Sequence, residues 1–177
     1  MFMQLRTPSD PGLSPAYRLG QGVLVVTACV VLAALGFQYL GGYAPCELCR
    51  AERYVYYAAL PALFIALALL AAERRWPATA LFVLVALAFL FGAGLGTYHA
   101  GVEWNFWPGP AACTAGPESV STDAGALLSR LQRVRVPRCD VAPWHFLGLS
   151  FAGWNVVASL ALAVGALATA LKVLRHG

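Results

Sequence analysis

Five cysteines offer the most specific chemistry in the sequence, and four of them fall into two groups. Cys46 and Cys49 form a Cys-x-x-Cys pair, whereas Cys113 and Cys139 stand further along the chain with 25 residues between them. Two thiols at a helix start can close a small disulfide ring, and the free N–H groups of the first turn stabilise a thiolate there. The first pair therefore indicates thiol redox chemistry.

Two charged residues follow this pair at helical spacing. Arg53 lies four residues beyond Cys49, which on a helix places the guanidinium over the same face. Its positive charge is expected to stabilise a thiolate at Cys49. Glu52 lies three residues beyond Cys49 and opposes this effect, and the sequence does not fix where its carboxylate points.

Other uses of the cysteines have to be weighed against redox chemistry. Cys46, Cys49, Cys113 and Cys139 could together hold zinc, but the second pair does not repeat the spacing of a zinc ribbon, so we expect no metal. A purely structural disulfide between Cys113 and Cys139 stays open. Cys29 stands among Val and Ala and is expected to be an inert packing residue.

The elements that must position these residues are predicted from composition and hydropathy. The chain has 177 residues, of which 60% are hydrophobic and 11% charged, which excludes an ordinary soluble domain. The net charge of +4 is scattered, which argues against nucleic-acid binding. Four stretches are long and apolar enough to cross a bilayer, and we predict an all-α membrane protein, a four-transmembrane-helix bundle, with spans at 19–40, 54–72, 77–98 and 146–171.

An even number of crossings places the connections 41–53 and 99–145 on the same side of the membrane. We expect one membrane domain over 19–172 between the tails 1–18 and 173–177. The two sides of the membrane carry equal numbers of basic residues. Those on the side of the chain termini lie in short segments next to the spans, where the positive-inside rule has most force, so we predict cytoplasmic termini and periplasmic connections. The longer connection is predicted to carry a short amphipathic helix, whose apolar face is Leu127, Leu128, Leu131 and Val134. This helix either lies on the membrane surface or is a solvated helix packed on the bundle.

Several motifs together resemble the disulfide bond formation protein B (DsbB) family. The residues that carry the resemblance are Pro-Cys-Glu-Leu-Cys at 45–49 with Glu52-Arg53, the separate Cys113 and Cys139, and Phe-Leu-Gly-Leu-Ser at 146–150 with Trp154-Asn155. It covers essentially the whole chain after the N-terminal tail. The resemblance implies an enzyme of the bacterial inner membrane that reoxidises a periplasmic DsbA-like thiol oxidase and passes the electrons to a membrane quinone, ubiquinone or menaquinone.

The resemblance also implies roles for individual residues. Cys113, with Cys139 as its partner, would exchange disulfides with the thiol oxidase, and the Cys46/Cys49 disulfide would reoxidise that pair. Cys49 would deliver electrons to the quinone, and Arg53 would hold the quinone head. His99 resembles a family histidine near the quinone, although an interfacial histidine without a chemical role is the alternative.

Three other functions compete with this interpretation. The first is a paralogue that serves a dedicated partner thiol protein. The second is a quinone reductase of the vitamin K epoxide reductase type, although such proteins are expected to carry the membrane Cys-x-x-Cys late in the bundle. The third is a non-catalytic four-span scaffold whose loops are cross-linked by structural disulfides.

Overall fold

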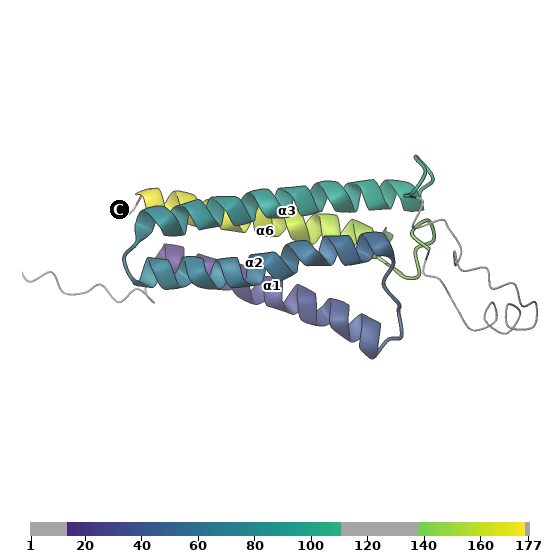
Figure 1. The fold of residues 1–177 in the computed structure, drawn as a ribbon, viewed down its shortest axis with the longest axis horizontal. Coiled ribbons are helices and arrows are strands. Elements are labelled where there is room, and N and C mark those ends of the chain that lie inside the picture. Colours follow the sequence, from purple (N-terminus) through teal and green to yellow (C-terminus); the bar gives the residue numbers. More distant parts are fainter. Residues whose placement is uncertain (1–13, 111–137, 176–177) are drawn as a thin grey trace, which may run out of the picture.

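Four long helices form the protein in a computed structural model, which describes residues 14–110 and 138–175. They run roughly side by side, and a two-stranded hairpin precedes the last helix (Figure 1). The elements are α1 (Pro15–Tyr39), α2 (Glu47–Ala71), α3 (Arg75–Glu103), β1 (His145–Phe146), β2 (Leu149–Ser150) and α6 (Phe151–Arg175). Cys113 and the predicted amphipathic helix over 127–134 lie outside the described residues.

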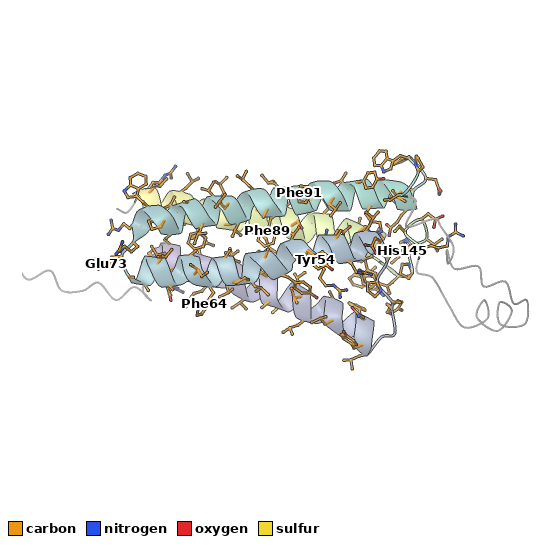
Figure 2. All side chains as sticks on the ribbon, viewed as in Figure 1. Tyr54, Phe64, Glu73, Phe89, Phe91 and His145 are labelled. Carbon is orange, nitrogen blue, oxygen red and sulfur yellow. The ribbon has the colours of Figure 1, made fainter. Side chains whose placement is uncertain are left out.

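All four helices are apolar and long enough to cross a membrane. A helix of 25 residues spans about 38 Å at a rise of about 1.5 Å per residue, against about 30 Å of hydrocarbon. Large apolar side chains face outward, among them Phe64 at 66% exposure and Phe91 at 67%, whereas Phe89 is fully buried (Figure 2). Such an outer surface needs lipid around it, so the predicted four-span all-α membrane fold is confirmed.

The helix ends explain why the spans differ from those predicted. Ser14 caps α1 by accepting from the N–H of Tyr17, with Pro15 in the first turn, so this helix begins before residue 19. Cys46 caps α2, which begins at Glu47 rather than at 54, because the polar first two turns are helical although they lack the hydropathy of a span. Hydropathy detects the apolar part of a helix and misses such turns.

The start of the last helix is displaced in the opposite direction. The predicted span begins at 146, but residues 145–150 form an antiparallel hairpin and α6 begins at Phe151. The turn consists of Leu147 and Gly148, both with positive φ, at 52° and 81°. This is the backbone of a tight two-residue hairpin turn, in which a positive φ favours glycine at position 148.

Close packing joins α3 to α6. A Cβ atom on Gly96 would lie 2.9 Å from Asn155 Nδ2 and 3.0 Å from Val156 Cγ2, so only glycine fits without movement of α6. The core between the helices is mainly apolar, and Leu63, Phe82 and Phe89 have no exposed surface there. These contacts fix the ends of α2, α3 and α6 relative to one another.

One end of the bundle gathers the segments that carry the chemistry. The connection from α1 to α2, the end of α3 and the hairpin before α6 lie at the right of Figure 1, whereas the turn from α2 to α3 and the end of α6 lie at the left. Cys46 and Cys139 therefore lie at the same end, as the parity of the crossings predicts.

Candidate redox site

Cys46 and Cys49 form a hydrogen-bonded pair at the start of α2. Their Sγ atoms lie 2.8 Å apart, and Cys46 Sγ also accepts from the backbone N–H of Cys49 at 3.3 Å. The hydrogen bond with the Cys49 thiol lowers the pKa of Cys46 to about 5, and His99 adds to this effect, while burial opposes it. At neutral pH, Cys46 in the reduced pair is therefore a thiolate, which is the reactive form of the residue.

A buried histidine connects this pair to two carboxylates. His99 is 2% exposed, and its Nε2 lies 3.6 Å from Cys46 Sγ. Its Nδ1 lies 2.7 Å from Glu52 Oε1, and its Nε2 lies 3.9 Å from Glu103 Oε1. Ser150, at the start of α6, hydrogen-bonds to the other oxygen of Glu103. The resemblance placed His99 near the quinone; in the structure His99 lies against Cys46 and is not among the residues that line the cavity described below.

Cys139 packs against the same end of the pair. It is 1% exposed, takes part in a disulfide bond, and shares a small buried cluster with Cys46, Leu48 and Val102. Its predicted partner, Cys113, lies outside the described residues. The structure thus brings a disulfide and the Cys-x-x-Cys pair into one apolar cluster, from which water is largely excluded.

A cavity of about 340 Å³ opens beside Cys49 between α1, α2 and α6. Volumes of this size hold small organic ligands. Cys49, Glu52 and Arg53 line one side of it, and most of the remaining lining is apolar or aromatic. The aromatic residues around it are Phe37, Tyr43, Tyr56, Trp144, Phe151 and Trp154.

Arg53 is held at the cavity by α1. Its guanidinium donates to Gln38 Oε1 at 2.5 Å, and both residues line the cavity together with Cys49. Sequence reasoning placed Arg53 over the face of Cys49, and the shared cavity agrees with that placement. Gln38 as its partner has no signal in the sequence, because the contact depends on how α1 packs on α2.

A second polar group lies deeper in the bundle. The Tyr56 hydroxyl donates to Asn155 Oδ1 at 2.7 Å and lies 2.8 Å from Ser159 Oγ. Tyr56 is 3% exposed, and both Tyr56 and Asn155 line the cavity. The hydrogen bonds satisfy hydroxyl groups that would otherwise be costly to bury.

Sequence reasoning missed or misplaced several residues. Glu103 was not singled out, although a glutamate four residues after a histidine is a readable helical-face signal, and Ser150 was noted only as part of the motif at 146–150. Cys29 was expected to be a free, inert packing residue; it is free, but its side chain is exposed on α1 rather than packed against another helix. Hydropathy along α1 does not separate the lipid-facing side from the core side when both are apolar.

The comparisons with known proteins agree with the geometry. The family model described as Disulfide bond formation protein DsbB matches residues 18–169, which is most of the chain. The chain belongs to the DsbB family. It is therefore a membrane protein of disulfide bond formation, a disulfide-forming oxidoreductase by family.

Individual relatives in the DsbB family share about three residues in ten with this chain. Disulfide bond formation protein B of Acidovorax sp. (strain JS42) is 30% identical over 151 residues, which cover 80% of both chains. The protein of the same name from Paracidovorax citrulli (strain AAC00-1) is 29% identical over 161 residues, 86% of both chains. That of Polaromonas sp. (strain JS666 / ATCC BAA-500) is 28% identical over 163 residues, 86% of this chain and 90% of the relative. No solved structure is significantly similar to the chain.

Proposed function

We propose that this protein reoxidises a periplasmic DsbA-like thiol oxidase and passes the electrons to a membrane quinone. The observation that carries the proposal is the position of the Cys46/Cys49 pair. Cys46 shares a small buried cluster with the disulfide-bonded Cys139, whereas Cys49 lines an apolar cavity. The pair therefore lies between a second disulfide and a site for an apolar ligand.

The cavity residues fit a quinone headgroup. A quinone is a flat ring with two carbonyl oxygens and, in membranes, an apolar tail. The aromatic side chains offer faces for the ring, and the Arg53 guanidinium offers a charge-assisted donor to a carbonyl oxygen. When bound, the quinone supplies a two-electron acceptor beside the Cys49 sulfur. Ubiquinone and menaquinone both suit this description.

The cysteines act in two exchanges under this proposal. The thiolate of the reduced partner attacks Cys113 and breaks the Cys113–Cys139 disulfide, and resolution of the mixed disulfide leaves the partner oxidised and both cysteines reduced. A thiolate of this reduced pair then attacks Cys46 and breaks the Cys46–Cys49 disulfide, with Cys49 as the leaving thiolate. The second cysteine of the pair attacks the resulting mixed disulfide, which restores the Cys113–Cys139 bond and releases Cys46 as a thiolate. Each exchange conserves the number of disulfides, so the electron pair arrives at Cys46 and Cys49.

The same proposal assigns the sides of the membrane. The end of the bundle with Cys46 and Cys139 faces the periplasm, and both chain termini face the cytoplasm of a bacterial cell. This orientation follows from the basic residues of the short flanks, such as Arg74, Arg75 and Lys172. It also places the disulfide chemistry in an oxidising compartment.

A turnover experiment tests the function. Purified protein in detergent is mixed with a reduced DsbA-like protein and a short-tailed ubiquinone, and quinol formation and partner oxidation are followed together. We expect one partner disulfide per quinol, and no turnover in Cys49→Ser. Absence of quinol formation by the intact protein with both ubiquinone and menaquinone analogues would contradict the proposal and favour the scaffold function.

A further inference from the structure

The two cysteines of the pair differ in their access to the cavity. Cys49 lines it, but Cys46 is not among the lining residues and is only 6% exposed. A group that leaves Cys46 for the cavity must therefore pass through neighbouring side chains. One such neighbour is Cys49, whose Sγ lies 2.8 Å from Cys46 Sγ but carries its own proton in the dithiol. The other route runs through His99 and Glu52.

The contacts between these residues form a continuous chain. Cys46 Sγ lies 3.6 Å from His99 Nε2, and His99 Nδ1 lies 2.7 Å from Glu52 Oε1. Glu52 in turn lines the cavity with Cys49. The side chains of His99 and Glu52 are 2% and 8% exposed, so bulk water has little access to either.

The proposed reaction needs two protons at the cavity. Oxidation of the Cys46/Cys49 dithiol to its disulfide releases two electrons and two protons, and reduction of a quinone to a quinol takes up the same number. The proton of Cys49 is released at the cavity wall, but that of Cys46, which is a thiolate in the reduced pair, has already left the sulfur behind that wall, on the side of His99. We propose that His99 and Glu52 carry the Cys46 proton to the cavity, an inference that rests on the proposed function.

The surroundings of His99 suit a group that gains and loses a proton. The titratable groups facing it in the described residues are Cys46, Cys49 and Glu52 from α2 and Glu103 from its own helix. Two carboxylates beside one imidazole stabilise the imidazolium that forms when His99 accepts a proton. The low pKa of Cys46, about 5, favours release of the proton in the direction of the histidine.

Glu103 is a positioning residue in this arrangement. It does not line the cavity, but its carboxylate lies against His99 Nε2 and bonds to Ser150 at the start of α6. It thereby ties the ring of His99 to a second helix and keeps Nε2 turned toward Cys46. The proton path itself consists of His99 and Glu52.

Single-turnover kinetics test the path. The protein is reduced with dithiothreitol, freed of reductant and mixed with saturating short-tailed ubiquinone, and quinone absorbance is followed. Glu52→Gln and His99→Asn should each slow the reduction at saturating ubiquinone by about 10²–10⁴-fold, the range of general acid–base catalysis, and runs at lower ubiquinone concentrations should show no higher ubiquinone KM. Glu52→Asp should recover part of the rate, and added imidazole should recover part of the rate of His99→Gly.

The chain offers a matched control for the carboxylate. Glu47 lies on the same helix, is half exposed and pairs with Arg50 rather than with His99. Glu47→Gln should therefore leave the rate of ubiquinone reduction unchanged. Thermal unfolding of every variant checks that the bundle is intact.

A second measurement needs no quinone. The alkylation rate of Cys46 in the reduced, quinone-free protein is followed against pH, with peptide mass spectrometry to separate Cys46 from Cys49. His99→Asn should move the apparent pKa of Cys46 upward, because the neutral amide cannot supply the charge of an imidazolium. An unchanged profile would show that His99 does not interact with Cys46, which would overturn the path.

The kinetic outcomes separate this inference from the function on which it rests. If Glu52→Gln reduces ubiquinone at the wild-type rate, or differs from the wild type only by a higher ubiquinone KM, the proton path is wrong. The proposed quinone reduction is not contradicted by either result. Failure of the wild-type protein to reduce ubiquinone or menaquinone would instead contradict the proposed function. If Glu52→Gln and His99→Asn are both slow, but neither Glu52→Asp nor added imidazole restores part of the rate, then Glu52 and His99 have a structural role. This result would contradict the inference.

Discussion

At the scale of single residues, two arginines one turn apart have different partners. Arg50 forms an ion pair with Glu47 at 3.4 Å on the exposed side of α2. Arg53 instead donates to the neutral Gln38 and lines the cavity beside Cys49. Among residues 14–110 and 138–175, no carboxylate forms an ion pair with Arg53 at the cavity, which leaves its charge for an acceptor oxygen or a thiolate.

Replacement of Arg53 tests this role. Arg53→Ala should raise the apparent ubiquinone KM by about 10- to 100-fold, because a hydrogen bond to a charged group contributes about 1.5–3 kcal/mol. Disulfide exchange with the partner protein, measured without quinone, should not change. Arg50→Ala is the matched control and should retain the wild-type KM. An unaltered KM in Arg53→Ala would remove Arg53 from the quinone site.

Sequence reasoning identified these single residues unevenly. Cys46, Cys49 and Arg53 were singled out because a short helical spacing links them directly. Glu52 was noted without a direction for its carboxylate, and Glu103 was not singled out. Their roles depend on His99, which belongs to α3. The spacing of residues along α2 or along α3 does not predict how the two helices are rotated relative to each other.

At the scale of elements, the contact between α3 and α6 holds the histidine in place. Gly96 lies one turn before His99. Asn155, Val156 and the backbone of Ala152 occupy the space that a side chain at position 96 would need. Gly94, two residues earlier, has open space where a side chain would project. The two glycines therefore offer a comparison of inward and outward faces on one helix.

A larger side chain at Gly96 should separate the two helices. Gly96→Leu should lower the free energy of unfolding by about 1–3 kcal/mol through overpacking, and displace His99 from Cys46. Thermal unfolding in detergent and the rate of ubiquinone reduction measure the two effects. Gly94→Leu should change neither. Equal stability of the two variants would contradict the close contact of α3 with α6.

The elements themselves were largely predictable. Four apolar runs predict four helices, and Gly92 with Gly96 predicts a close helix contact. The helix starts were less predictable, because the turns at Glu47 and at the hairpin before Phe151 depend on capping and on backbone angles. A hydropathy profile does not reveal these local features, yet they determine where Cys46 and Ser150 lie.

At the scale of the whole molecule, the bundle has two chemically different ends. His145 lies at the end with the cysteine cluster, and Glu73 lies at the opposite end, both exposed (Figure 2). Four crossings and the shared end of Cys46 and Cys139 were predictable from parity alone. The cavity was not, because it is formed by side chains of three helices whose relative tilt the sequence does not specify.

Accessibility of the two ends tests the orientation. In a background whose native cysteines are replaced by serine, His145→Cys should react with a membrane-impermeant maleimide in intact spheroplasts. Glu73→Cys should react only after the membrane is permeabilised. The opposite pattern would place the cysteine cluster in the cytoplasm and contradict the proposed orientation.

Cys46, Cys49, His99 and Glu52 lie together at one end of the bundle, and this position determines whether the reaction moves charge across the membrane. Electrons and protons would travel together over one short distance, so no net charge would cross the bilayer. A unit charge moved across a membrane gains or loses about 2.3 kcal/mol per 100 mV. The reaction would be electroneutral, and its rate would not respond to the voltage that a respiring cell maintains.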